Sequence, residues 1–281
     1  MYLAACVQMR AGADIPANLE RVEALAERAA RWGASLVATP ENTTFLGPSD
    51  QKVAIAEPLD GRTHLRLGRL AKQLRIHLLV GSVAERCDAT RCYNTSLLFG
   101  PDGSLLAHYR KLHLFDIDIP GKMTFRESDT LTPGGSPTLV DTSAGRLGLG
   151  ICYDLRFPEL ALLYARAGAS LLVYPGAFNT VTGPLHWELL ARARAVDAQC
   201  YVCVCSPSRV PGASYQAHGR SMVVGPFAEV VATAEAPGDV ACMVTAEMEY
   251  GQVAERRRNL PLWAQRRGDL YRLVDVKEEE R

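Results

Sequence analysis

The segment RLGLGICYDLRFP, residues 146–158, constrains the fold more than any other part of this chain. Its first half alternates leucine or isoleucine with glycine, which is typical of a short buried strand. Pro158 then begins a segment whose apolar residues recur at helical spacing. Cys152 therefore lies where a strand ends and the chain turns towards a helix.

Two interpretations of Cys152 follow from this position. A corner between a strand and a helix can present a small side chain on rigid support, as the nucleophile elbow of serine hydrolases does. A nearby helix N-terminus would also lower the pKa of the thiol and favour the thiolate. The alternative is a buried cysteine at the end of a strand, which is the commoner situation for this residue. The local pattern leaves both interpretations open.

Composition narrows the class of protein. The chain has 281 residues, 48% of them hydrophobic, which suffices for one large domain or two small ones with a substantial core. Lysine plus arginine and aspartate plus glutamate each number 31, so the net charge of zero argues against nucleic acid or an anionic membrane as the main partner. No apolar run approaches the ~18 residues of a membrane span, and the first residues lack the basic region of a signal peptide. We therefore expect a cytoplasmic protein.

The eight cysteines do not form a recognisable metal site. Cys200, Cys203 and Cys205 lack the second pair of ligands that would complete one, so a core strand is the better interpretation. Cys87 and Cys92 flank a predicted hairpin loop. The sequence does not say whether they ever pair, and a reduced state is the default in the cytoplasm.

Strands alternate with helices along the chain, and hairpins interrupt the alternation. This pattern predicts one α/β domain with mixed sheets over residues 1–281, with a charged tail from about residue 274. Residues 112–137 show neither the helical nor the strand period of apolar residues. They are rich in aromatic residues, glycine and proline, which favours a functional loop. We expect strands at 1–9, 35–39, 76–80, 93–99, 104–110, 138–142, 146–151, 170–174, 201–205, 221–224, 229–232 and 240–246, and helices at 15–32, 63–74, 159–167, 185–196 and 250–259.

Three reactive side chains each follow a predicted strand: Glu41, Lys111 and Cys152. Functional groups gather at the carboxyl ends of strands in open α/β sheets, so these three could face one pocket. A carboxylate can take the proton of a thiol, and an ammonium can stabilise an oxyanion. Taken singly, Glu41 and Lys111 could be surface charges. None of the six histidines lies in a recognisable Cys-His setting, and a structural role is the better interpretation for all except His113.

The residues around these positions carry a family resemblance. The Pro-Glu pair ending at Glu41, the segment YRKLHLF around Lys111 and the segment GICYDLRFPE around Cys152 are similar to the three signature blocks of the nitrilase superfamily of carbon–nitrogen hydrolases. The resemblance extends from the first strand to the arginines at 256–258. It implies a four-layer α-β-β-α sandwich that dimerises through its outer helices. It also implies a Glu-Lys-Cys triad, with a second family glutamate matching Glu127.

The resemblance implies hydrolysis of a small-molecule amide through a thioester, without a metal or an organic cofactor. Glu41 would take the thiol proton while Cys152 attacks the carbonyl carbon. Lys111 and the backbone N–H of Tyr153 would stabilise the oxyanion. Glu41 would then help ammonia to leave and activate water. General acid–base catalysis contributes a factor of about 10²–10⁴ in rate, and one oxyanion donor about 10²–10³.

Two amidase branches of the superfamily compete for the substrate. Residues 113–128, 174–179, 182–190 and 206–207 are similar to the omega-amidases, which act on 2-oxoglutaramate and 2-oxosuccinamate. Residues 40–46, 56–61 and 192–201 are nearer the deaminated glutathione amidases. Because the segment nearest the chemistry, 113–128, follows the omega-amidases, we predict that activity.

Either substrate presents a 2-oxo acid, whose carboxylate needs a cation. Arg156, four residues after the nucleophile, is our candidate because a guanidinium can bind a carboxylate bidentately. An ion pair of Arg156 with Glu159 or Asp154 is an equally good interpretation.

Other functions fit less well. Another small-amide hydrolase or a true nitrilase is the nearest alternative. A nucleotide-binding α/β module belongs to a different class and is weakly supported by Gly145, Gly148 and Gly150. Cys152 and Tyr153 follow where a dinucleotide-binding motif needs its third glycine, and the chain has no Walker A sequence.

Overall fold

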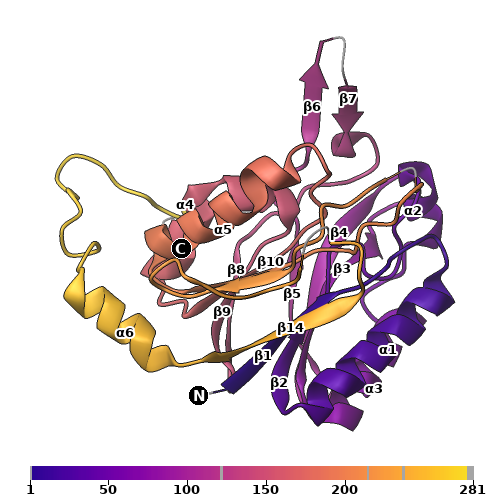
Figure 1. Ribbon diagram of the computed structural model, residues 1–281. Coiled ribbons are helices and arrows are strands. Elements are labelled where there is room, and N and C mark those ends of the chain that lie inside the picture. Colours follow the sequence, from indigo (N-terminus) through magenta and orange to yellow (C-terminus); the bar gives the residue numbers. More distant parts are fainter. Residues whose placement is uncertain (1, 121–122, 214, 236–237, 277–281) are drawn as a thin grey trace.

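Two six-stranded sheets pack face to face in the computed structural model, which describes residues 2–120, 123–213, 215–235 and 238–276 (Figure 1). The strand order is β14-β1-β2-β3-β4-β5 in the first sheet and β13-β12-β11-β10-β9-β8 in the second. The first sheet consists of β1 (Tyr2–Gln8), β2 (Ala34–Ala38), β3 (His77–Arg86), β4 (Cys92–Phe99), β5 (Leu105–Arg110) and β14 (Cys242–Met248). The second consists of β8 (Thr138–Thr142), β9 (Gly145–Leu149), β10 (Leu171–Pro175), β11 (Tyr201–Cys205), β12 (Met222–Val224) and β13 (Val230–Thr233).

Helices cover the outer face of each sheet. The helices are α1 (Ile15–Arg31), α2 (Ser49–Ile55), α3 (Arg62–Leu74), α4 (Pro158–Arg166), α5 (Gly183–Ala198) and α6 (Tyr250–Asn259). Leu19 of α1 and Leu67 of α3 pack in one buried cluster with the outer face of the first sheet. Helices α4 and α5 lie on the second sheet (Figure 1). The predicted four-layer α-β-β-α sandwich is therefore confirmed.

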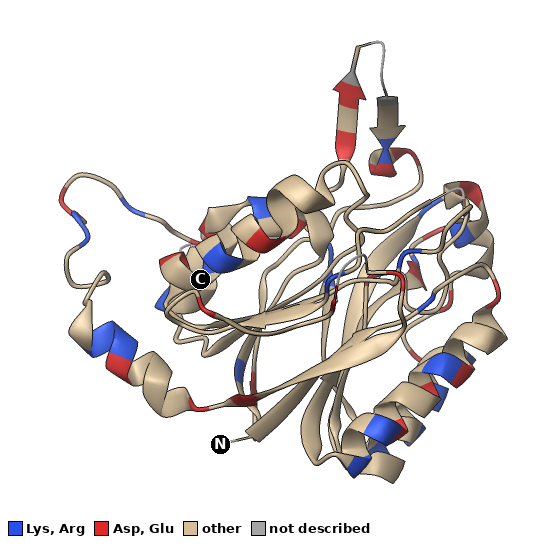
Figure 2. Ribbon diagram, in the orientation of Figure 1, with Lys and Arg blue, Asp and Glu red and all other residues tan. Residues whose placement is uncertain are grey.

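The inner faces of the two sheets share one core. Leu36 and Leu79 from the first sheet belong to the same buried cluster as Leu149 and Val173 from the second. Cys200, Cys203 and Cys205 are buried in this cluster, as predicted for a core strand. Arg and Glu residues are interspersed along the outer helix α1 (Figure 2).

Parallel strands in the middle of each sheet bring several carboxyl ends together. Strands β1, β2 and β3 run parallel in the first sheet, and β9, β10 and β11 run parallel in the second. The last strand, β14, returns to the first sheet and pairs antiparallel with β1, with Cys6 opposite Val244. No described helix is long and apolar enough to span a membrane.

The structure corrects two predictions about elements. Residues 112–137 are not structureless: β6 (Asp116–Ile119) and β7 (Met123–Arg126) form a hairpin that projects from the sandwich (Figure 1). Each strand has four residues, too few for their alternation to stand out from a loop. The short helix α2 was not predicted, because it has no buried residue and hence no apolar face. The predicted charged tail lies partly outside the described residues, from position 277 onwards.

Candidate active site

Cys152 occupies a tight turn between β9 and α4. It begins a 3₁₀ turn, Cys152–Arg156, which leads to α4 at Pro158. Its φ of 49° lies in the left-handed region, which residues other than glycine mostly avoid. Residues in this conformation are concentrated at functional sites. Gly176, just after β10, is packed beneath it, since a Cβ there would lie 3.1 Å from the Cα of Cys152. The predicted corner between strand and helix is thus confirmed.

Glu41 is buried just beyond the end of β2, with 3% of its surface exposed. One carboxylate oxygen accepts a hydrogen bond from Asn94 Nδ2 at 2.9 Å, and the other accepts one from the backbone N–H of Ala177 at 2.9 Å. Gly81 of β3 allows the close approach that holds this turn. Its N–H donates to Thr39 Oγ1 at 2.9 Å, and a Cβ there would lie 2.0 Å from the Thr39 carbonyl oxygen.

Lys111 bridges two carboxylates immediately after β5. Its Nζ lies 3.2 Å from Glu41 Oε1, and 3.0 and 2.8 Å from the two oxygens of Glu127. Glu127 also accepts a hydrogen bond from the backbone N–H of Phe115 at 2.8 Å. Only 1% of Lys111 is exposed, and a charge buried to this degree requires such partners.

Asp154 connects the turn that carries Cys152 to the segment that carries Lys111. Its fully buried carboxylate accepts hydrogen bonds from the Ile151 N–H at 2.8 Å, the Tyr109 hydroxyl at 2.7 Å and the His113 N–H at 3.0 Å. The His113 ring bonds to it through Nδ1 at 2.7 Å and stacks on Phe157 with ring centroids 3.6 Å apart. His113, the histidine whose role the sequence left open, is thereby assigned to structure.

Glu41, Lys111, Glu127 and Cys152 form one cluster, and the charges in it determine its protonation state before substrate binds. Burial raises the pKa of Glu41, but the ammonium groups of Lys111 and Lys52 and a hydrogen bond from the Cys152 thiol outweigh burial and bring it below the usual value. Burial lowers the pKa of Lys111, but Glu127 and Glu41 outweigh it and hold the pKa well above the usual value. The resting cluster therefore holds a carboxylate at Glu41 and an ammonium at Lys111.

The environment of the thiol agrees with a mechanism in which Glu41 takes its proton. Burial and the charge of Glu41 raise the pKa of Cys152 well above its usual value. The structure does not favour the suggested lowering of this pKa by a helix N-terminus, because the thiol lies against carboxylates and only a short 3₁₀ turn begins at Cys152. The neutral thiol needs a base, and Glu41 accepts its hydrogen bond.

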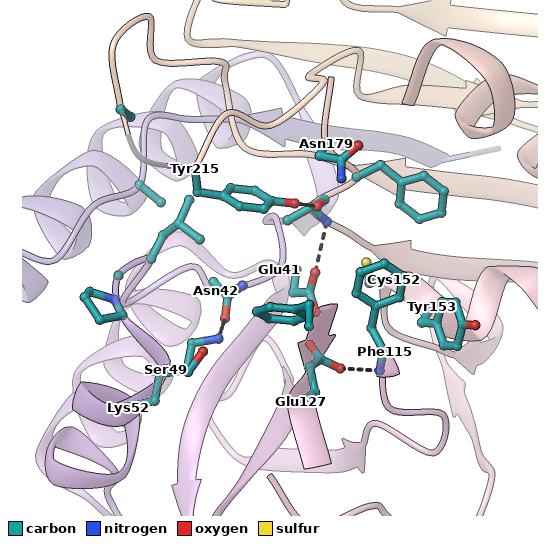
Figure 3. A pocket seen from close by; sticks show the side chains of 18 of the residues that line it. Glu41, Asn42, Ser49, Lys52, Phe115, Glu127, Cys152, Tyr153, Asn179 and Tyr215 are labelled. Atoms are coloured by element: carbon teal, nitrogen blue, oxygen red, sulfur yellow. Dashed lines mark hydrogen bonds between the residues drawn. The ribbon is translucent and has the colours of Figure 1, made fainter. Parts of the chain in front are cut away.

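Glu41, Lys111, Glu127 and Cys152 all line one cavity of about 510 Å³. Figure 3 shows Glu41, Glu127 and Cys152 pointing into a common space. Aromatic rings form much of the wall, and none of the described residues that line it is a histidine. The aromatic residues are Phe115, Phe125, Tyr153, Phe178 and Tyr215.

Arg156 lines the same cavity. Its guanidinium lies 4.8 Å from the centre of the Phe178 ring and 5.8 Å from that of Tyr153, and one nitrogen is 3.3 Å from His186 Nδ1. No ion pair joins Arg156 to a carboxylate within the described part of the chain, so the predicted alternative of a pair with Glu159 or Asp154 is wrong. Arg156 thus presents an unpaired positive charge beside the cavity.

Sequence reasoning missed several residues of the site. Asn94 carried a signal, because an asparagine in the apolar strand CYNTSLLF needs a buried partner. The Ala177 N–H is a backbone group and leaves no mark in the side-chain pattern. The Tyr215 hydroxyl donates to the Ala177 carbonyl, and Lys52 donates to Asn42 Oδ1 at 2.9 Å. Both belong to segments without a clear period.

Comparison with known proteins places this site in a family. The carbon-nitrogen hydrolase family model matches residues 3–258, which include the whole cluster. The chain belongs to the carbon-nitrogen hydrolase family. This carbon-nitrogen hydrolase is 51% identical to the chloroplastic omega-amidase of Arabidopsis thaliana, over 96% of this chain and 73% of the plant protein. It is 48% identical to the omega-amidase NIT2 of Homo sapiens, over 98% of each chain.

A solved structure agrees with these relatives. The crystal structure of Saccharomyces cerevisiae Nit3, a member of the nitrilase superfamily, superposes with a TM-score of 0.85 at 42% identity. The match covers 95% of this chain and 96% of the yeast chain. Family, fold and relatives agree that this carbon-nitrogen hydrolase is an amide-hydrolysing enzyme.

Proposed function

We propose that this amidase hydrolyses the terminal amide of a small 2-oxo acid, 2-oxoglutaramate or 2-oxosuccinamate, to the acid and ammonia. The observation that carries the proposal is the unpaired charge of Arg156 in the cavity that holds Glu41, Lys111 and Cys152. A guanidinium there can bind the carboxylate of the 2-oxo acid while the far end of the molecule reaches the thiol. The similarity to omega-amidases of 48–51% identity supports the same substrates.

Acylation begins with the neutral thiol of Cys152. Glu41 takes the thiol proton as sulfur attacks the amide carbon, which overcomes the raised pKa of the thiol. The ammonium of Lys111 and the backbone N–H of Tyr153 stabilise the negative charge that develops on the carbonyl oxygen. Protonated Glu41 then gives its proton to the leaving nitrogen, the C–N bond breaks and ammonia departs, leaving a thioester on Cys152.

Deacylation uses the same groups in a second cycle. Glu41 removes a proton from water, the resulting oxygen attacks the thioester carbon, and the thiol regains a proton as the acid leaves. Glu127 positions Lys111 throughout, since it binds both the ammonium and the Phe115 N–H. No step requires a metal ion or an organic cofactor.

A second copy of the chain is the proposed partner. Helix α5 presents Leu185 and Leu189, each 64% exposed, and Val181 just before it is 72% exposed. An apolar stripe of this kind favours burial against a copy of itself in a homodimer. We propose further that residues 1–281 act as one domain, because the two sheets share a core, and that the enzyme works in the cytoplasm.

The test is an amide panel with two readouts. Purified enzyme is given 2-oxoglutaramate, 2-oxosuccinamate, deaminated glutathione, glutaramate without the oxo group, and a matched nitrile, and both ammonia and the acid are measured. We expect the largest kcat/KM for the 2-oxo amides and none for the nitrile. A kcat/KM for deaminated glutathione well above that for 2-oxoglutaramate would overturn the choice of substrate.

A further inference from the structure

A second cavity, of about 200 Å³, lies at the N-terminal end of α5, outside the active site. Three basic side chains line it: Arg209, His218 and Arg220. Gly183 and Pro184, from the first turn of α5, form another part of its wall. The proposed reaction uses none of these residues, so their arrangement calls for a separate explanation.

This cavity is distinct from the active-site cavity, although neighbouring residues of the chain line the two. Arg209 lies in the wall of the second cavity, whereas Ser208 and Val210 on either side of it line the active site. Gly183 likewise lines the second cavity, and Thr182 before it lines the active site. No described residue belongs to both walls. A ligand in the second cavity would therefore not occupy the position of the substrate.

Two buried nitrogens in this wall, His218 Nδ1 and Arg220 Nε, have no hydrogen-bond partner among the described residues. Only 9% of His218 is exposed, and its side chain packs directly over Gly183, where an added Cβ would lie 2.3 Å from the His218 Cβ. Buried polar groups are nearly always hydrogen-bonded, so two such groups in one wall need a partner. A neutral imidazole donates from one ring nitrogen, and a guanidinium only donates, so the missing partner is an acceptor.

Positive charge exceeds negative charge around the cavity. Arg209 forms no ion pair with a described residue, and its guanidinium makes two hydrogen bonds of 3.4 Å to backbone carbonyls. Arg220 has one distant carboxylate, since Glu188 Oε2 lies 3.9 Å from it, and Glu188 also pairs with Arg192 at 3.6 Å. Burial and the charges of Arg209 and Arg220 lower the pKa of His218. The missing acceptor is therefore an anion.

The first turn of α5 adds to the positive potential. The helix has 16 residues, and its N-cap residue, Thr182, makes no side-chain capping hydrogen bond. The N-terminal end of a helix carries a partial positive charge and backbone N–H groups without helical partners. Phosphate groups commonly bind at such an end, and guanidinium groups bind phosphate oxygens with a matching geometry.

We propose that the cavity between Arg209, His218 and Arg220 binds a phosphate group, either as inorganic phosphate or as the phosphate of a small monoester. Phosphate carries nearly two negative charges near neutral pH and at least three acceptor oxygens, so it can satisfy donors on several sides of the wall. A carboxylate has one charge and two oxygens, which leave part of the wall without a partner. The volume of about 200 Å³ is below the roughly 300–1,000 Å³ of sites for drug-sized ligands, so the ligand is small.

Calorimetric titration of the whole enzyme with inorganic phosphate, methyl phosphate and acetate, at constant ionic strength, tests the proposal. Arg209→Gln and Arg220→Gln each remove one cation from the wall of the second cavity. Arg156→Met removes the cation of the active-site cavity. Arg31→Gln, which removes an exposed arginine from the end of α1, is the control for loss of one charge. Sedimentation analysis measures the oligomeric state of each variant.

We expect the wild type to bind phosphate more tightly than acetate. Arg209→Gln and Arg220→Gln should each raise the Kd for phosphate by on the order of tenfold, as for the loss of a hydrogen bond between charged groups. Arg156→Met and Arg31→Gln should leave this Kd unchanged. Methyl phosphate that binds as tightly as inorganic phosphate supports a monoester as the ligand, whereas weaker binding of methyl phosphate supports the free anion.

Three results would overturn the proposal. The first is a wild type that binds phosphate no more tightly than acetate. The second is a Kd for phosphate that changes in Arg156→Met but not in Arg209→Gln or Arg220→Gln, which would place the phosphate in the active-site cavity. The third is a wild type that binds no phosphate and that dissociates into single chains in Arg209→Gln or Arg220→Gln, which would show that a second copy of the chain fills the cavity. None of these results bears on amide hydrolysis, which does not use this cavity.

Discussion

The buried carboxylate of Asp154 accepts a hydrogen bond from the hydroxyl of Tyr109 at 2.7 Å. This contact joins the strand that leads to Lys111 to the turn that carries Cys152. The two residues come from different sheets, since Tyr109 lies on β5 and Asp154 follows β9. The distance between the ammonium and the thiol therefore depends on a carboxylate that does not line the cavity.

Asp154→Asn should lower kcat more than it raises KM, because it disturbs the placement of reacting groups and leaves substrate contacts alone. The side-chain amide of the introduced asparagine cannot accept all four hydrogen bonds that the carboxylate of Asp154 accepts. Each buried donor left unsatisfied costs about 1–3 kcal/mol. Kinetics and thermal unfolding measure the two effects. Tyr109→Phe removes only one of the four donors and serves as the milder comparison. Equal kinetics in Asp154→Asn and wild type would contradict the positioning role.

Cys152→Ala should abolish turnover while the protein remains folded. The wild type should also accumulate a substrate-derived thioester on Cys152, detectable by mass spectrometry after rapid acid quenching. Cys242→Ala is the matched control, because Cys242 is another half-buried cysteine and lies on β14 away from the cavity. Activity in Cys152→Ala equal to that in Cys242→Ala would rule out Cys152 as the nucleophile.

Glu41→Gln and Lys111→Met should lose most of kcat with KM little changed, since the proposed mechanism has both groups act in the transition state. Lys111→Met should also lower the unfolding temperature, because it leaves Glu41 and Glu127 buried together without their cation, a loss worth about 3–5 kcal/mol for a broken buried pair. Glu127→Gln tests the positioning role. Near-wild-type kinetics in that variant would assign Glu127 to loop structure.

Arg156→Met should raise KM for 2-oxoglutaramate by on the order of tenfold or more, because it removes the proposed charge-assisted contact to the substrate carboxylate. Arg156→Lys should recover only part of the loss, since an ammonium cannot bind the carboxylate with a planar fork. The comparison is with a neutral amide of similar length, whose kinetics should not depend on residue 156. An equal effect on both substrates would point to a structural role for Arg156.

The pH profile of kcat/KM should be flat from about pH 6 to about pH 9. Glu41 has a lowered pKa, so its basic form persists until the pH falls below the usual range of a glutamate. Lys111 has a raised pKa and stays protonated well into alkaline solution. The thiolate absorbance of wild type and Cys152→Ala should match near pH ~8.5, since burial and Glu41 keep this thiol protonated. An inflection near that pH, absent in Cys152→Ala, would show a thiolate at rest.

The sequence predicts those helices and strands whose apolar residues recur at a regular spacing over enough residues. Helix α1, with Leu19, Val22 and Ala26 on one face, was predicted to within one residue. Helix α2 and the β6–β7 hairpin were not predicted, because seven residues without a buried face and two strands of four residues carry too little pattern.

The site is predictable where each group follows a strand, and not where its partners come from far along the chain. The positions of Glu41, Lys111 and Cys152 in one cavity follow from strand ends. The Ala177 N–H that holds Glu41 lies 136 residues away from it, and a backbone donor has no signature in the sequence. The protonation of the thiol depends on burial and on the carboxylates around it, which only the packed structure reveals.

Strand β14 is the last strand of the chain to be synthesised, and it pairs with the first strand, β1. Every member of the cluster around Cys152 has emerged long before residues 242–248, yet β1 has an unpaired edge until β14 is made and pairs with it. A nascent chain stopped short of this strand would hold its reactive groups in a sheet with an open edge, which invites pairing with other chains. The last strand therefore acts as the closure that separates a competent enzyme from an aggregation-prone intermediate on the ribosome.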